Sequence, residues 1–214
     1  MDLVARLEKT YTGVVHDVMR AMGLRDFTLP PEIRPLAPGP VLAGVVATVS
    51  GRVDPRADPH QTLLGWTGLL SRARPATVLI CQPNDSAVAH MGELSAETLK
   101  RKGVRGYVAD GGCRDVDFIL ELGFPVWCRY YTPRDIVGYW LPDRFDQPIT
   151  IGAVTIAPGD LALGDRDGMV ILPAARADDI VAAAESAIGT ENLVRKAILE
   201  GVDPQEAYRQ YGKF

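Results

Sequence analysis

The sequence predicts an α/β protein in which a βαβαβ unit with parallel strands lies beside a layer rich in β-hairpins. Between residues 75 and 129, apolar runs that suit strands alternate with segments that suit helices. This alternation indicates parallel pairing with right-handed crossovers. Between residues 149 and 173, short apolar runs are separated by tight glycine turns, which is typical of hairpins. We therefore predict an α+β sandwich and not a doubly wound parallel sheet.

The length of 214 residues allows one sizeable core, and we predict a single domain over residues 1–214. Its expected parts are an N-terminal helical arm (about 1–40), a core (about 41–173) and C-terminal helices (about 174–214). The net charge of −4 argues against a basic face for phosphate backbones, so we expect no nucleic-acid partner.

The composition also predicts a cytoplasmic protein without a membrane segment. No window approaches eighteen uninterrupted apolar residues, and the first residues lack the pattern of a signal peptide. The cysteines Cys81, Cys113 and Cys128 are odd in number and have no CxxC spacing. We interpret them as reduced thiols, not as a disulfide frame or a zinc site.

The N-terminal arm should contain two short helices within residues 2–23, with Gly23 as the C-cap. The proline-rich residues 28–40 should form no regular structure. The β-branched run at 41–53 predicts a strand buried on both faces. A short helix is expected at 62–71.

The central region should supply the parallel unit. Glycines at the predicted helix ends, Gly103 and Gly123, separate its parts. The expected elements are a strand (76–81), a loop (82–92), a helix (93–102), a strand (104–109), a helix (116–122) and a strand (125–129).

The C-terminal region changes in character. Asp167-Gly168 between apolar flanks indicates a hairpin. This interpretation explains Asp165-Arg166-Asp167-Gly168 better than a metal site does. Apolar residues at helical spacing then predict a long helix at 174–200 and a short one at 204–211.

The most informative stretch for function begins at Gly92-Glu93-Leu94-Ser95 and ends at Arg114-Asp115. Each motif lies where a predicted strand turns into a helix, and open α/β sheets bind ligands at such loops. The free amides of Leu94 and Ser95 at a helix N-terminus suit an anion. Taken alone, Glu93 is explained by the helix dipole.

The turn from Asp110 to Asp115 strengthens the functional interpretation. Its two glycines allow the backbone a close approach to a ligand. The structural alternative is an N-cap aspartate beside a surface arginine. However, Asp110, Asp115, Glu93 and Arg114 are all expected at one sheet edge, which exceeds what capping requires. Arginine clamps carboxylates, and carboxylate oxygens suit Mg²⁺ or Mn²⁺.

Several motifs resemble the family of regulator of ribonuclease activity A, which includes metal-dependent 4-hydroxy-4-methyl-2-oxoglutarate aldolases. The resemblance runs from about residue 12 to the C-terminus. It rests on Gly92-Glu93-Leu94, Val108 to Asp115, Leu122 to Val126, Thr132-Pro133-Arg134-Asp135, Pro158-Gly159-Asp160 and Asp165 to Gly168.

The resemblance implies an αββα sandwich of the swivelling β/β/α kind, assembled as a homotrimer or homohexamer with sites between subunits. It also implies a lyase that forms pyruvate from a 4-hydroxy-2-oxo dicarboxylate, and that also decarboxylates oxaloacetate. Asp115 would bind Mg²⁺ or Mn²⁺ directly, with Glu93 and a neighbouring subunit's Glu191 acting through water. Arg114 would bind the substrate, and Gly92 and the amides of Leu94 and Ser95 would hold its carboxylate.

The chemistry of aldol cleavage agrees with this assignment. A hard cation stabilises the negative charge that develops on a 2-keto oxygen. The other solution, a Schiff base, needs a desolvated lysine. All lysines of the chain lie in polar or helix-surface contexts: Lys9, Lys100, Lys102, Lys196 and Lys213.

The sequence departs from the family pattern at two positions. Many aldolase members have aspartate at Glu93, and the pattern prefers an acidic residue at Phe118, to which Asp117 is adjacent but about 100° away on a helix. Among weaker candidates, a single histidine is more often structural, and only His90, two residues before Gly92, is kept as a candidate for the pocket. Tyr130, Tyr131 and Trp140 are expected in the core or at an interface.

Two other functions are alternatives to the lyase. A regulator that binds and inhibits a ribonuclease would suit an acidic surface, but it has no need of Glu93, Arg114 and Asp115 together. A methyltransferase is poorly supported because no glycine-rich loop follows a first strand.

Overall fold

The longest strand, β2 (Leu42–Val53), organises the main sheet of the computed structural model, which describes residues 2–39 and 41–213. The sheet has the order β1-β6-β4-β3-β2-β11-β12, and β8 also pairs with β2. Its other strands are β1 (Arg34–Pro35), β3 (Thr77–Gln82), β4 (Gly106–Ala109), β6 (Val126–Cys128), β8 (Trp140–Phe145), β11 (Leu161–Asp165) and β12 (Gly168–Leu172).

Strands β2, β3, β4 and β6 pair in parallel, as the alternation of strands and helices predicts. The strands β11 and β12 form an antiparallel hairpin that continues the same sheet from β2. The β-rich part is therefore joined to the parallel part by hydrogen bonds through β2. The expected mixed α/β architecture is confirmed.

The sheet curls until its two edges nearly meet. Thr28 forms a bridge with Val170 of β12, and a few residues later β1 pairs with β6 at the opposite edge. The proline-rich segment 28–40 was expected to contain no regular structure, and this is wrong for β1. Its carbonyls and amides instead link the two edges of the sheet.

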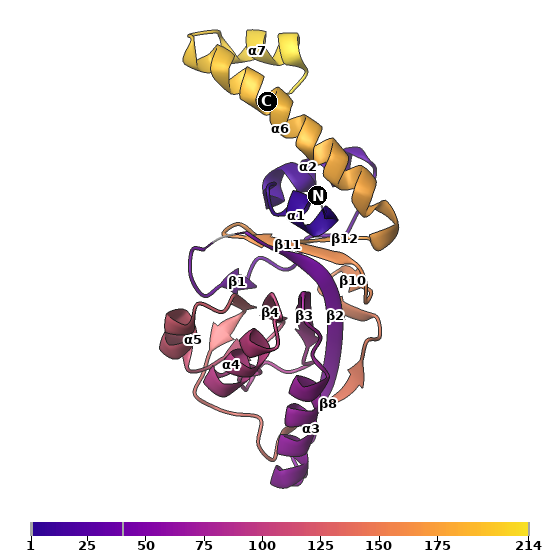
Figure 1. Cartoon of the computed structure of the whole chain (residues 1–214), viewed down its shortest axis with the longest axis vertical. Helices are drawn as coiled ribbons and strands as arrows, with labels where there is room; N and C mark the ends of the chain where they lie inside the picture. Colours follow the sequence, from indigo (N-terminus) through magenta and orange to yellow (C-terminus); the bar gives the residue numbers. More distant parts are fainter. Residues whose placement is uncertain (1, 40, 214) are drawn as a thin grey trace.

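Helices cover two regions of the outer face of the curled sheet (Figure 1). On one side α3, α4 and α5 pack on the parallel strands, around Leu79, Tyr107 and Val126. On the other side α1, α2 and α6 pack on β11 and β12, around Leu163 and Val170. The helices are α1 (Leu3–Leu7), α2 (Thr12–Ala21), α3 (Pro59–Arg72), α4 (Glu93–Arg101), α5 (Val116–Leu122), α6 (Ala177–Leu199) and α7 (Pro204–Tyr211).

A third apolar cluster fills the inside of the curl. It joins Val46, Ile80 and Trp127 of the main sheet to a small hairpin of β9 (Ile149–Ile151) and β10 (Val154–Ile156). A second small sheet pairs β5 (Gly112–Cys113) with β7 (Tyr130–Tyr131). Because all of β2 from Thr48 to Gly51 is buried, the prediction of a strand buried on both faces is confirmed.

Three elements differ in detail from the prediction. Helix α3 begins at Pro59 because the Asp58 carboxylate accepts a hydrogen bond from the Gln61 amide and caps it. A short 3₁₀ turn (Ala174–Arg176) precedes α6. The hairpin turn is closed by the pair Asp165 and Gly168, so its central residues are Arg166 and Asp167.

The strand β8 was not predicted. Its sequence contains a proline and two charged residues, Asp143 and Arg144, so it lacks an apolar alternation. Within the described ranges, no helix is both long and apolar enough to cross a bilayer.

Candidate active site

A cavity of about 540 Å³ opens where β3 and β4 end and the chain enters α4 and α5. One wall is apolar and comes from α3, which contributes Leu63, Trp66 and Leu70. The opposite wall is charged, with Glu93, Arg114, Asp115 and Asp135. The loops at the carboxyl ends of the parallel strands thus bring Glu93, Arg114 and Asp115 together, as open α/β sheets do with their ligand sites.

Gly92 makes the close approach of the two motifs possible. A Cβ atom at this position would lie 2.7 Å from Asp115 Oδ2 and 3.2 Å from both Cγ and Nε of Arg114. Any other residue would therefore push the arginine and the aspartate away from the start of α4. The glycine of the Gly92-Glu93 motif is explained by this contact.

Asp115 has an unusual backbone. Its φ of 55° and ψ of 38° lie in the left-handed region. This conformation is unfavourable in free energy for any residue other than glycine. Its carboxylate makes no capping hydrogen bond to α5, the helix that it precedes. Instead Oδ2 accepts a hydrogen bond of 3.1 Å from the Glu93 amide at the start of α4. Asp115 therefore does not cap α5, the helix that follows it, as the structural alternative would require.

Arg114 lies between two carboxylates. Its Nε is 3.4 Å from Asp115 Oδ2, and its Nη1 is 3.5 Å from Asp135 Oδ2. These separations are longer than those of a tight bidentate pair, and about 39% of the arginine side chain is exposed. The guanidinium thus keeps N–H groups that a bound anion can use.

The N-terminus of α4 supplies further donors. Glu93, Leu94 and Ser95 are its first three residues, and the first intrahelical hydrogen bond joins the Ala96 amide to the Gly92 carbonyl. The amides of Leu94 and Ser95 consequently have no acceptor within the helix. The Ser95 hydroxyl accepts a hydrogen bond of 2.8 Å from Trp66 Nε1, which ties α3 to this helix start.

Asp110 does not join the site. Its carboxylate is paired with the Arg129 guanidinium, and it does not line the cavity. The expectation that Asp110 converges with Glu93 and Asp115 is wrong, because the arginine that follows β6 attracts it. The third carboxylate of the site is Asp135, from the loop after β7.

His90, kept as a candidate for the pocket, borders the cavity, but its ring is fully buried. Burial lowers the pKa of His90 to about 4, although the Asp85 carboxylate 3.5 Å away opposes this shift. Within the described residues neither ring nitrogen has a hydrogen-bond partner. The ring packs against Trp140 and beneath Gly111, whose Cβ would lie 2.6 Å from Nδ1. His90 is neutral at pH 7 and supports the floor of the site.

Glu191 lies on α6 and does not line this cavity; Figure 1 shows α6 at the other end of the molecule from α4 and α5. Its carboxylate accepts hydrogen bonds from Tyr11 and from Lys213, whose Nζ is 2.7 Å away. Burial raises the pKa of Glu191, but these two donors outweigh burial and hold it below its ordinary value. Within one chain, then, Glu191 takes no part in the site.

The carboxylates that line the cavity suit a cation that keeps most of its water ligands. No group of three histidine, cysteine or acidic side chains that could enclose a metal ion occurs among residues 2–39 and 41–213. Mg²⁺ is usually bound through one or two carboxylates and keeps several waters. Asp115, with the Glu93 and Asp135 side chains lining the same cavity, fits that kind of binding.

Sequence reasoning missed Trp66 and Asp135 as site residues. Trp66 lies on a helix almost thirty residues before Glu93, and no local pattern relates the two. Asp135 belongs to the Thr132-Pro133-Arg134-Asp135 motif, which the resemblance had singled out without a role. This motif was the only feature of the sequence that could have indicated Asp135 as a site residue.

The curled mixed sheet and the cavity at its crossover loops, which an arginine and carboxylates line, define a mixed α/β protein of the RraA-like kind. The Aldolase/RraA family model, described as RraA-like, matches residues 12–171, and this chain belongs to that family.

Three comparisons illustrate the relationship. A provisionally named 4-hydroxy-4-methyl-2-oxoglutarate aldolase of Halalkalibacterium halodurans is 29% identical over 141 residues, which is 64% of this chain and 65% of that protein. The solved structure of Streptomyces coelicolor RraAS2, of the RNase ES inhibitor RraA family, is 29% identical with a TM-score of 0.80, covering 90% of this chain and 95% of that one.

A further structure, described as one of novel cellulases from gut-associated microbes, is 31% identical with a TM-score of 0.84, covering 89% of this chain and 85% of that one. The chain spans a little under two thirds of the Halalkalibacterium protein and 34% of Legionella pneumophila Protein DlpA, another relative.

Proposed function

We propose that the protein is a divalent-metal-dependent lyase that releases pyruvate from a 4-hydroxy-2-oxo dicarboxylate, decarboxylates oxaloacetate, or does both. The observation that carries this proposal is the joint placement of Gly92, Arg114 and Asp115. A strained aspartate faces the start of a neighbouring helix, and an arginine beside it keeps free N–H groups. Strain of this kind is concentrated at functional sites.

The side chains have distinct roles in the proposed reaction. Arg114 would bind a carboxylate and the keto oxygen of the substrate, since its guanidinium is only loosely paired. The amides of Leu94 and Ser95 would hold the substrate carboxylate at the positive end of α4. Glu93 would take or return the proton of the C4 hydroxyl through a water molecule.

Asp115 would hold the cation, with Glu93 near it. When bound, Mg²⁺ or Mn²⁺ would supply Lewis-acid stabilisation of the negative charge on the substrate oxygen. The alternative of a Schiff base is not supported, because none of the lysines, all of which the structure describes, lines the cavity.

We also propose a homotrimer or homohexamer, in which a neighbouring copy's Glu191 completes the site. In Figure 1 the far end of α6 and the helix α7 extend away from the sheet. This part exposes large apolar side chains, including 54% of Leu193 and 80% of Leu199. Such exposure on a projecting arm supports packing against another copy.

A second candidate is the ribonuclease inhibitor of the RraA type, which the relationship to Streptomyces coelicolor RraAS2 favours. A cellulase is not supported. Glycoside hydrolysis places two carboxylates on either side of a neutral sugar bond, whereas here Asp115 and Asp135 lie on either side of a guanidinium.

The test is a panel of 2-oxo acids, including oxaloacetate and 4-hydroxy-4-methyl-2-oxoglutarate, assayed for pyruvate with Mg²⁺, with Mn²⁺ and with a chelator. We expect release that needs the metal and is lost in Arg114→Ala. Absence of metal-dependent release from every member would contradict the lyase. Capture of a ribonuclease that is unaffected by Asp115→Ala would then favour the inhibitor.

A further inference from the structure

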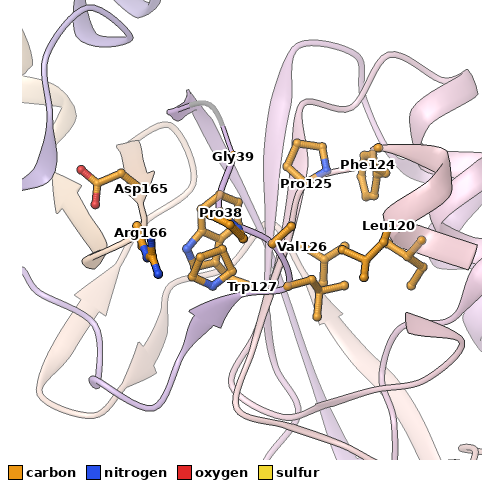
Figure 2. Close-up of a pocket in the computed structure, with 14 residues that line it drawn as sticks. Pro38, Gly39, Leu120, Phe124, Pro125, Val126, Trp127, Asp165 and Arg166 are labelled. Atoms are coloured by element: carbon orange, nitrogen blue, oxygen red, sulfur yellow. The ribbon is translucent and has the colours of Figure 1, made fainter. Parts of the chain in front are cut away.

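A second cavity, of about 230 Å³, lies on another part of the molecule from the candidate active site. It is bounded by residues 35–39, by the end of α5 and by the turn between β11 and β12 (Figure 2). Its walls are mainly apolar and include Leu36, Leu120, Phe124, Pro125 and Val126. None of the residues proposed for catalysis lines it.

The frame of this cavity is fixed by backbone hydrogen bonds. The Leu36 amide donates to the Val126 carbonyl at 3.0 Å, and Pro35 is in register with Trp127 across the β1–β6 pair. Arg34 Nη1 donates to the Asp167 carbonyl at 2.6 Å and so ties the hairpin turn to β1. The cavity is therefore a built feature of the fold.

Its floor contains a buried donor without an acceptor. Trp127 lines the cavity and only 3% of it is exposed, and its Nε1 has no hydrogen-bond partner within the described residues. Atom Cε2, which is bonded to Nε1, lies 3.3 Å from the position of a Cβ on Gly164. The Cζ2–Cε2 edge of the indole thus faces β11, the strand that leads to Arg166. Buried indole N–H groups usually find a partner.

The rim of the cavity carries an arginine side chain that forms no ion pair with any described residue. Arg166 is exposed, and its guanidinium is absent from every hydrogen bond and ion pair found in the described part of the chain. Asp165 also borders the cavity, but its carboxylate is directed elsewhere. It accepts hydrogen bonds from the amide and hydroxyl of Thr12 and from the Asp167 amide. Figure 2 shows it pointing away from Trp127.

We propose that this cavity binds a small amphipathic monocarboxylate whose ring or branched alkyl group enters between Leu36 and Phe124. Its carboxylate would pair with Arg166 and accept a hydrogen bond from Trp127 Nε1. The cavity volume of about 230 Å³ is smaller than that of typical ligand pockets, which measure about 300–1,000 Å³. It is larger than the cavity of about 150 Å³ that holds benzene, so it suits a ligand with one ring. Charge complementarity distinguishes this ligand from a neutral apolar one.

The test uses the full-length ¹⁵N-labelled protein and 3-phenylpropionate as the probe, with 3-phenylpropionamide as its neutral counterpart. The indole N–H resonance of Trp127 is assigned by its loss in Trp127→Phe. We expect this resonance to shift saturably with the acid, while those of Trp66 and Trp140 stay in place. The amide should bind more weakly.

Variants separate this cavity from the active site. Arg166→Gln should weaken binding about fivefold, as expected for an exposed ion pair. The matched variant Arg56→Gln, at an exposed arginine elsewhere, and Arg114→Ala should leave the affinity unchanged. The proposal is overturned if the Trp127 resonance does not saturate, if the acid and the amide bind equally, or if Arg166→Gln has no effect. If the Trp127 resonance shifts with protein concentration in the absence of the probe, a second copy of the chain occupies the cavity. That result would also overturn the proposal.

Discussion

At the scale of single residues, the conformation of Asp115 and the presence of glycine at position 92 depend on each other. Asp115 adopts a left-handed backbone in which it does not cap its own helix, and its Oδ2 reaches the first amide of α4. Gly92 leaves the space that this contact needs. The free energy that the strained aspartate costs, roughly 1–2 kcal/mol, is explained if its carboxylate has a chemical role.

Gly92→Ala tests this relation. The added methyl group would overlap Asp115 Oδ2 and displace it together with Arg114. Both are ends of flexible side chains, so we expect the free energy of unfolding to change by less than about 1 kcal/mol. Activity should fall about a hundredfold, since a displacement near 1 Å can have that effect. Thermal unfolding and the rate of pyruvate release should be measured together, and an unimpaired rate would contradict the account.

His90 predicts a pH dependence of stability. Its pKa is lowered to about 4 in the folded protein, mainly by burial, so the unfolded chain binds more protons between about pH 6.5 and 4. Stability is therefore complete above pH 6.5 and is lost as the pH falls, by at most about 3 kcal/mol.

Urea unfolding at pH 7 and pH 5 measures this effect. In His90→Gln the difference between the two pH values should shrink, while His60→Gln, at an exposed histidine, should keep it. An equal pH dependence in all three proteins would show that burial of His90 is not its cause.

At the scale of elements, the parallel unit could be predicted from sequence and β8 could not. Gly103 and Gly123 have positive φ just after α4 and α5, as glycines that end helices do, so the sequence marks where both helices end. By contrast, β8 pairs with the end of β2 across a β-bulge between Ser50 and Gly51. Its pairing depends on distant residues, so its own sequence carries little signal.

Gly51→Ala should break the pairing of β8 with β2. A Cβ at this bulge would lie 2.0 Å from Trp140 Cζ2 and 2.5 Å from the Leu141 carbonyl oxygen, which is backbone. We expect destabilisation of about 3 kcal/mol or more, at the upper end of overpacking effects. The matched variant Gly68→Ala, on α3 with open space around its Cβ, should instead stabilise by up to about 1 kcal/mol. Similar unfolding midpoints for the two variants would contradict the assigned bulge.

The site could be predicted in part, for a similar reason. Glu93, Arg114 and Asp115 follow consecutive strands of a parallel unit, so topology alone brings them together. Asp135 replaces Asp110 because side-chain pairing, here of Asp110 with Arg129, decides which carboxylates reach the cavity. Such pairing between separate loops has no local sequence pattern.

At the scale of the whole molecule, the proline-rich segment 28–40 was the least predictable part, whereas the sequence predicted both C-terminal helices. Residues 28–35 join both edges of the sheet, which requires the edges to be close already. The end of α6 and α7 project from the sheet (Figure 1), and the apolar residues that they expose support the proposed assembly.

The assembly predicts complementation between subunits. Glu191→Ala and Arg114→Ala should each be inactive alone, and mixed oligomers should recover activity because some sites contain both intact residues. The arm variant Leu193→Asp with Leu199→Asp should reduce the mass measured by light scattering. A native mass equal to one chain, or mixtures that stay inactive although oligomers exchange, would contradict a shared site.

The most direct test of the lyase is the Mn²⁺-dependent release of pyruvate by Asp115→Asn and Asp117→Asn. Asparagine tolerates the left-handed backbone and keeps an oxygen for the Glu93 amide, so only the charge at Asp115 is lost. Asp117 is an exposed carboxylate two residues further along α5. We predict that Asp115→Asn abolishes metal-dependent release and that Asp117→Asn retains it. Equal rates in both variants would show that the carboxylate at Asp115 is not required.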